Sequence, residues 1–199
     1  NLTIGPLVCE AIPRRFRLDP MSDVQILTPM HRGLLGARNL NDEFQQLLNP
    51  RGPALVRGGT TFRRGDRVMQ TVNDYDKDVF NGDIGAITAV NLEDQELTIT
   101  FDGRDVVFER SDMDEIVLAY ATTIHKSQGS EYPIVVLPFM MTHFVMLQRN
   151  LLYTAVTRAK KVLVLLGERK AVGYAIRNQK TSGRNTRLDE RLKTEGVKW

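Results

Sequence analysis

The hydrophobic pattern at the start of the chain predicts alternating helices and strands. Apolar residues over 2–15 recur at helical spacing, and this helix is expected to end near Pro13. The short apolar run 24–29 stops at a proline, which predicts a buried strand. The stretch 32–50 predicts a second helix, because Leu40, Phe44, Leu47 and Leu48 share one helical face and a proline closes the stretch.

From residue 61 the apolar period changes from 3.6 to 2, which indicates strands. The turn signals are Asn-Gly-Asp at 81–83 and Asp-Gly at 102–103, where the backbone accepts positive φ. The expected strands are 65–72, 84–90, 96–101, 104–109 and 116–124. Several short strands joined by tight turns predict a small β-barrel, assigned to residues 61–118.

Helices and strands alternate again after residue 133. We expect a strand at 134–138, a long helix at 143–160, a strand at 162–167 and a helix over 169–179. The polar, basic residues 181–199 predict at most a short helix. Continuous apolar strands separated by helices indicate a parallel sheet covered on both faces. The predicted fold is therefore an α/β domain, residues 1–60 and 119–199, interrupted by the barrel.

Charge is unevenly distributed between the two predicted parts. The chain carries +3 overall, but residues 61–118 hold 14 acidic and 6 basic side chains, a net of −8, so the remainder carries +11. A basic body with an acidic insert is compatible with a polyanionic partner bound by the body. The composition, 42% hydrophobic and 26% charged, is that of an ordinary soluble globular protein.

Several features bear on the location of the protein. No apolar run approaches a membrane span, and the first residues do not have the pattern of a signal peptide. Cys9 is the single cysteine, which suits a reducing cytoplasm, and the three histidines show no metal-ligand spacing with it. The chain starts without Met and in mid-pattern, so we expect a fragment of a longer cytoplasmic protein.

Four stretches carry a resemblance. "TPMHRGLLGARNLN", "ATTIHKSQGSEYP" and "LLYTAVTRAKKVLVLLG" resemble, in order, the motifs of the second motor domain of superfamily 1 DNA helicases of the RecD type. "GDRVMQTVNDYDKDVFNGDIG" resembles the SH3-like barrel inserted in that domain. The resemblance covers nearly the whole chain. It implies a RecA-like α/β fold interrupted by an SH3-like β-barrel.

The resemblance also implies ATP and Mg²⁺ as cofactors. Such motors place ATP between two RecA-like domains, and the first domain supplies the phosphate loop and holds most of the metal. This chain has no G-x-x-x-x-G-K-[ST]. We therefore expect it to lack ATPase activity alone and to need the N-terminal RecA-like domain of the same protein.

Arg158 is the residue to which the resemblance assigns catalysis. It corresponds to the arginine finger, which requires a planar donor fork of permanent charge to stabilise the transferring phosphoryl group. The alternative is a surface arginine near a helix C-terminus, where the helix dipole favours cations. The resemblance assigns Glu131 to the nucleotide's ribose, and Gly129 permits close approach of the backbone.

Other polar residues are expected to contact single-stranded DNA. The resemblance assigns to this contact the segment after a strand, with Thr123, His125 and Lys126 as phosphate or sugar ligands. A structural hydrogen bond is the alternative for His125. Between a strand end and a helix N-terminus, an anion site is expected at Thr28, His31, Arg32 and Gly33; the alternative is an ordinary helix start. Asn73 in the insert is a DNA candidate, although a turn role is favoured.

The resulting functional hypothesis is the C-terminal part of an ATP-dependent, RecD-like DNA helicase that moves 5′ to 3′ in recombination or repair. Its expected partners are single-stranded DNA and its junctions with duplex, together with other recombination or repair subunits. The helicase part of a conjugative relaxase and an RNA helicase remain alternatives. A non-catalytic nucleic-acid-binding scaffold is disfavoured, because it needs neither Glu131 nor Arg158.

Overall fold

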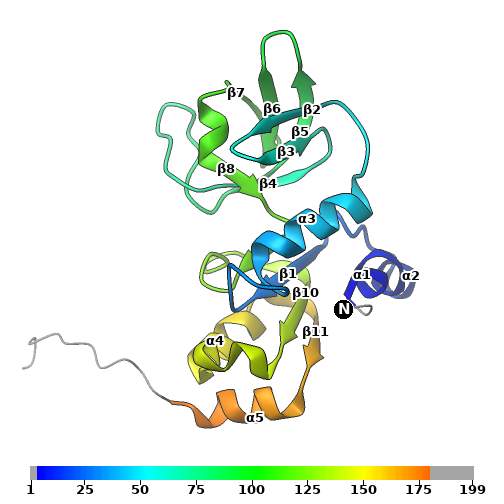
Figure 1. The fold of residues 1–199 in the computed structure, drawn as a ribbon, viewed down its shortest axis with the longest axis vertical. Helices are drawn as coiled ribbons and strands as arrows, with labels where there is room; N and C mark the ends of the chain where they lie inside the picture. The colour runs from blue at the N-terminus through cyan, green and yellow to red at the C-terminus, as the bar shows by residue number, and fades with distance from the viewer. Residues whose placement is uncertain (1–3, 180–199) are drawn as a thin grey trace, which may run out of the picture.

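The computed structural model describes residues 4–179, which form two lobes (Figure 1). The first lobe is built on a parallel sheet of four strands in the order β11-β10-β1-β9. Their bounds are Val24–Thr28 for β1, Ala121–Thr123 for β9, Tyr132–Phe139 for β10 and Ala159–Gly167 for β11. The predicted parallel sheet is thus confirmed.

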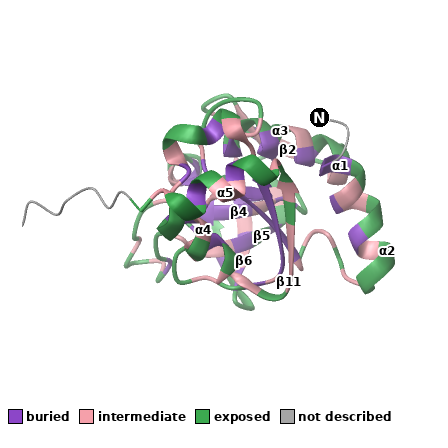
Figure 2. Cartoon of the chain, turned by 90° about the horizontal axis from the view of Figure 1, so that it is seen from below, coloured by how far each residue is buried: buried purple, intermediate pink, exposed green. Residues whose placement is uncertain are grey.

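Alternate residues of β10 enter two separate cores, one on each face of this sheet. Ile134 and Val136 pack with Phe44 of α3 (Ala37–Leu48), whereas Val135 and Leu137 pack on the opposite side. That second side is covered by α4 (Arg149–Val156) and α5 (Arg169–Arg177), below the sheet in Figure 1. Burial on both faces explains why the strand is a continuous apolar run. Figure 2 shows the buried segments inside the molecule, whereas α2 and α4 at its surface are largely exposed.

The N-terminal segment is one helical stretch that runs past Pro13. It consists of α1 (Ile4–Pro6), the π-helical turn η1 (Leu7–Ala11) and α2 (Ile12–Phe16), and ends where Arg17 adopts a left-handed φ of 54°. The expected end near Pro13 was wrong, because the helical stretch continues beyond the proline as far as Phe16.

The second lobe is the predicted barrel, enlarged by a hairpin. A five-stranded antiparallel sheet has the order β7-β6-β5-β4-β8. The strands are β4 (Arg67–Gln70), β5 (Ile84–Asn91), β6 (Glu96–Phe101), β7 (Arg104–Phe108) and β8 (Ile116–Leu118), with the 3-10 turn η2 (Asp112–Glu115) before β8. The turn at 102–103 is confirmed, since both residues have positive φ.

The hairpin of β2 (Ala54–Arg57) and β3 (Thr60–Arg63) was not expected from the sequence. Its turn is Gly58-Gly59, and both glycines have positive φ, as a tight two-residue hairpin turn requires. Residue 60, after which the domain boundary was expected, is the first residue of β3. Strand β8 ends at Leu118.

The run 116–124 is two strands, not the single strand that was expected. Leu118 pairs with Val68 in the barrel, whereas Ala121 pairs with Ile26 in the parallel sheet. Asn41 of α3 holds the connection between β8 and β9 with three hydrogen bonds. Its side-chain amide donates to the carbonyls of Leu118 and Ala121, and its side-chain oxygen accepts from the Ala121 N–H at 2.8 Å. The chain thus leaves one lobe and enters the other within two residues.

A buried carboxylate also ties the lobes together. Asp66 is fully buried and accepts from Gln45 at 2.5 Å, Asn49 at 2.6 Å and Tyr120 at 2.8 Å. Burial first, and then the Asp66 carboxylate, raise the pKa of Tyr120, so its hydroxyl remains a donor. One cluster of buried apolar residues also continues from the parallel sheet into the barrel.

Two expected helices are shorter than the pattern suggested. Helix α3 begins at Ala37, after a turn over 31–36. The stretch 143–160 contains the 3-10 segment η3 (Met141–Met146), then α4, and already enters β11 at Ala159. Strand β11 and helix α5 are otherwise as expected, and the interpretation of 181–199 lies outside the described residues. Within residues 4–179, none of the helices is long and apolar enough to cross a membrane.

Candidate functional site

One loop, residues 124–131, runs from the carboxyl end of β9 to the amino end of β10, and so connects the two opposite ends of the strands in the parallel sheet. It starts after Thr123, which pairs with Thr28 at the carboxyl ends of their strands, and ends before Tyr132 at the amino end of β10. Local hydrogen bonds fix the loop: the N–H of Lys126 and of Ser127 donates to the Thr123 carbonyl, and the buried Ser127 hydroxyl donates to the Ile124 carbonyl. The loop is therefore a folded connector with two distinct ends.

At the carboxyl edge, the loop borders a groove of about 310 Å³ between the two lobes. We call it the interlobe groove. It is lined by His31, Arg38 and Lys126, by one acid, Asp42, by Thr123, and by the hairpin turn Gly58-Gly59, among others. His31, Arg38 and Lys126 are exposed. The structure thus brings together His31, Thr123 and Lys126, three of the residues predicted to bind DNA.

Three backbone donors close to the expected anion site are used inside the turn over 31–36. The N–H groups of Gly36, Ala37 and Arg38 donate to the carbonyls of Gly33, Met30 and His31, at 3.0, 3.0 and 3.2 Å. In this conformation these three N–H groups therefore do not face a phosphate. Arg32 and Gly33 lie exposed on this turn, so the charge of the Arg32 side chain is open to an anion.

Thr28 is a corrected assignment. Its side chain is fully buried, and its hydroxyl donates to the Leu35 carbonyl at 2.6 Å. It fixes the turn that carries His31 and Arg32 and has no surface for a direct contact with DNA.

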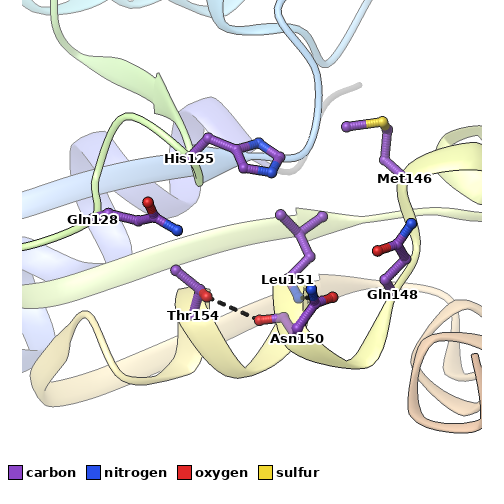
Figure 3. A pocket seen from close by; sticks show the side chains of 7 residues that line it. All are labelled: His125, Gln128, Met146, Gln148, Asn150, Leu151 and Thr154. Atoms are coloured by element: carbon purple, nitrogen blue, oxygen red, sulfur yellow. Dashed lines mark hydrogen bonds between the residues drawn. The ribbon is translucent and has the colours of Figure 1, made fainter. Parts of the chain in front are cut away.

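His125 points to a different cavity from Lys126. Figure 3 shows His125 and Gln128 on one side of this cavity and side chains of α4 and the segment before it on the other. We call it the amide pocket. It measures about 200 Å³ and is lined mostly by polar side chains: His125, Gln128, Gln148, Asn150 and Thr154, with Met146 and Leu151. The expected trio Thr123, His125 and Lys126 is thus divided between two cavities.

Asn73 lies on the exposed barrel loop between β4 and β5. Its side-chain oxygen accepts from the Asn81 N–H at 2.9 Å, and its amide donates to the Tyr75 hydroxyl. These contacts are those of the favoured turn role, and Asn73 is not among the residues that line the interlobe groove.

Glu131 and Arg158 lie together at the amino edge of the sheet. Arg158 lies just beyond the C-terminus of α4, not within a helix, and donates to the carbonyls of Thr154 at 3.2 Å and Ser130 at 2.9 Å. Glu131 is exposed and 3.5 Å from Lys160. Gly129 has a φ of 89° and an open side, so no side chain crowds a ligand there. This end of the sheet offers the Glu131 carboxylate, and the Arg158 guanidinium, whose hydrogen-bond partners among residues 4–179 are neutral groups.

Two functional candidates were missed by sequence reasoning. Arg38 belongs to the first turn of α3 and lines the interlobe groove, but it was interpreted only as part of a helix. Gly58-Gly59 faces the same groove, and this glycine pair between two short alternating runs is a hairpin signal that could have been used.

Comparison with known families agrees with this architecture. Residues 40–101 match the family described as the ATP-dependent RecD-like DNA helicase SH3 domain. Residues 118–166 match the UvrD-like helicase C-terminal domain. The first match covers α3, the hairpin and most of the barrel, and the second covers the loop 124–131 and Arg158.

The chain is similar to curated helicases over most of its length. It is 40% identical over 171 residues to the ATP-dependent RecD2 DNA helicase of Deinococcus radiodurans, covering 85% of this chain and 23% of the relative. It is 34% identical over 175 residues to the RecBCD enzyme subunit RecD of Haemophilus influenzae, covering 87% and 25%. The chain thus spans about a quarter of the length of these relatives.

Solved structures show the same fold. A Pif1 helicase from Bacteroides, in complex with ADP-AlF3 and ssDNA, has a TM-score of 0.61 at 20% identity, over 96% of this chain and 50% of that one. The Pif1 helicase of Candida albicans has a TM-score of 0.55 at 16% identity, over 96% and 53%.

The fold and the family matches define the class: a RecA-like α/β domain of the helicase type with an inserted SH3-like barrel. Within that class the chain is similar in sequence to parts of RecD-type helicases.

Proposed function

We propose that this chain is the C-terminal part of an ATP-dependent, RecD-like DNA helicase that moves 5′ to 3′ on single-stranded DNA in recombination or repair. The observation that carries the proposal is the loop 124–131, whose ends border the interlobe groove and the Glu131–Arg158 edge. A folded connector that reaches both ligand sites can couple ATP hydrolysis to movement along single-stranded DNA.

Arg158 serves as the arginine finger. In the described conformation its guanidinium donates to neutral carbonyls, so a phosphoryl oxygen can replace them with a stronger, charge-assisted hydrogen bond. Glu131 accepts from the ribose hydroxyls, and the open side of Gly129 lets the backbone approach the nucleotide. ATP supplies the phosphoryl group when it binds between this domain and the N-terminal RecA-like domain of the same protein.

Magnesium is assigned mainly to that other domain. In the described part of the chain, no group of three or more His, Cys, Asp or Glu side chains could hold a metal ion. No step is therefore assigned to a metal held by this chain.

Single-stranded DNA lies in the interlobe groove. Lys126, Arg38 and His31 meet its phosphates, Thr123 its phosphate or sugar oxygens, and Arg32 and Gly33 flank it on the exposed turn. His125 lines the amide pocket and reaches the strand only from that side. The proposed protein also binds junctions of single-stranded and duplex DNA and works with other recombination or repair subunits. Its proposed location is the cytoplasm.

Arg158→Ala in the full-length protein tests the proposal. We expect DNA-stimulated ATP hydrolysis to fall about 10³-fold, because a finger acts mainly on charge in the transition state, while single-strand affinity stays unchanged. Arg158→Lys should recover little, since an ammonium lacks the bidentate fork. Steady-state ATPase assays with oligonucleotide titrations measure both quantities. Retention of more than about a tenth of the wild-type kcat in Arg158→Ala would overturn the finger assignment.

A further inference from the structure

Arg67 reaches out of the barrel and into the motor lobe. It opens β4, but its guanidinium donates to the carbonyls of Met21 at 3.3 Å and Val24 at 3.1 Å, at the amino end of β1. It also lies 5.7 Å from the ring centroid of Tyr132, the first residue of β10. Arg67 therefore contacts the same edge of the sheet as Glu131 and Arg158.

The environment of Arg67 is costly for a charge. The ion pairs found among residues 4–179 do not include Arg67. Two carbonyls and an aromatic face contact its guanidinium, and the carboxylates of Asp23 and Asp19 favour its charge only from a distance. Burial lowers the pKa of this guanidinium, which shows that the surroundings disfavour its charged form. A neutral side chain of similar length would fill the space without this desolvation cost, so packing alone does not explain an arginine.

Tyr132 links Arg67 to the finger. The Tyr132 N–H donates to the Arg158 carbonyl at 2.8 Å, and the Arg158 side chain donates to the Ser130 carbonyl at 2.9 Å. Ser130 and Tyr132 flank Glu131, so both nucleotide candidates are held on the two sides of one short segment. The side chain of Tyr132 is buried and rests against the guanidinium of Arg67.

We propose that Arg67 is a positioning residue through which the inserted barrel sets the position of Arg158 and Glu131, by holding Tyr132. When single-stranded DNA enters the interlobe groove and displaces the barrel, Arg67 moves with the barrel and shifts the segment 130–132. The inference rests on the proposed function of Arg158 and adds to it a physical route from the barrel to the nucleotide.

Arg67→Met in the full-length protein is the test. It keeps length and apolar contact but removes the charge and both hydrogen bonds. We expect kcat for DNA-stimulated ATP hydrolysis to fall about tenfold, an effect typical of mutations along coupled contacts, with KM for ATP within about twofold. Arg67→Lys keeps a cation over the ring and should recover most of kcat.

Arg104→Met is the matched control, because Arg104 is also a barrel arginine that donates to two carbonyls, those of Lys77 at 2.7 Å and Asp78 at 2.5 Å, but within the barrel. Its kcat should equal that of the wild type. Equal losses in Arg67→Met and Arg104→Met, an unchanged kcat in Arg67→Met, or failure of Arg67→Lys to recover would each overturn the proposal.

Tyr132→Leu gives a second variant in case Arg67→Met does not fold. Leucine keeps the position apolar and the backbone hydrogen bond to Arg158 but removes the ring under the guanidinium. We expect a similar loss of kcat, and no further loss in the double variant, since both changes break one route. A double variant that loses the sum of the two single effects on kcat would contradict the proposed route through Arg67 and Tyr132. If Arg158→Ala itself is active, the proposed function fails; if only the Arg67 and Tyr132 variants are active, this inference alone fails.

Discussion

Gly36 shows how one residue positions part of the candidate site. Its φ of −78° is ordinary for any amino acid, but an added Cβ would lie 2.4 Å from the carbonyl carbon of Arg32 and 2.7 Å from the carbonyl oxygen of His31. The backbone of the turn that carries these two side chains is packed directly on Gly36. The glycine is needed for close approach, not for backbone freedom.

Gly36→Ala is therefore expected to destabilise the protein by about 2–3 kcal/mol, the cost of overpacking a site that cannot expand. Urea unfolding monitored by circular dichroism measures it. Gly33→Ala is the control on the same turn: Gly33 has a φ of 98° with open space around it, so strain of about 1 kcal/mol is expected. Equal effects of the two substitutions would show that the turn can yield around Gly36.

At this scale the sequence indicated residue types better than their contacts. Glu131, Arg158 and Lys126 were proposed from motifs. Glu131 and Lys126 are exposed, whereas Arg158 is partly buried and its side chain donates to the Ser130 carbonyl. Thr28 was assigned to DNA binding from its neighbours in the sequence. In the structure its hydroxyl donates to the carbonyl of Leu35, seven residues further along the chain. No local pattern reports where the chain folds back on itself.

Helix α3 and the loop 124–131 bring basic residues that are distant in sequence into the interlobe groove. Their combined positive charge can be tested in one double variant. Arg38 comes from the first turn of α3 and Lys126 from the loop 124–131. The double variant Arg38→Ala/Lys126→Ala in the full-length protein should bind single strands more weakly, equally for all sequences. The slope of log K against log salt should flatten by about 0.7 for each phosphate that the variant no longer neutralises.

Fluorescence anisotropy at several salt concentrations measures this slope. Arg110→Ala, which removes an exposed barrel arginine outside the groove lining, should leave it unchanged. An unchanged slope in the double variant would place the DNA elsewhere.

The element boundaries that failed did so for identifiable reasons. The run 116–124 is uniformly β-forming, so nothing local marks the exchange of partner from Val68 to Ile26. The stretch 143–160 has helical spacing throughout, but its first part forms the 3-10 segment η3 and its last residues pair with β10. Tertiary pairing overrode local preference in both.

At the scale of the whole molecule, the chain is proposed to hold one side of a nucleotide site. It has no phosphate-loop motif, and its described residues offer no metal cluster. The isolated chain is therefore expected to show no ATP turnover, with or without single-stranded DNA, in a coupled phosphate-release assay. An unfolded sample would give the same reading, so cooperative thermal unfolding serves as the control. Turnover stimulated by single strands in this chain would contradict the prediction.

The joint between β8 and β9 has a mechanical consequence. Only Ala119 and Tyr120 separate a barrel strand from a motor strand, and Asn41 clamps the carbonyls on both sides. A tether this short has no slack, so tension on the barrel passes to β9 and onward to the loop 124–131 without first stretching a linker. The inserted lobe is therefore expected to move as a rigid body with β9, so that a force on the barrel rotates the loop 124–131 as well.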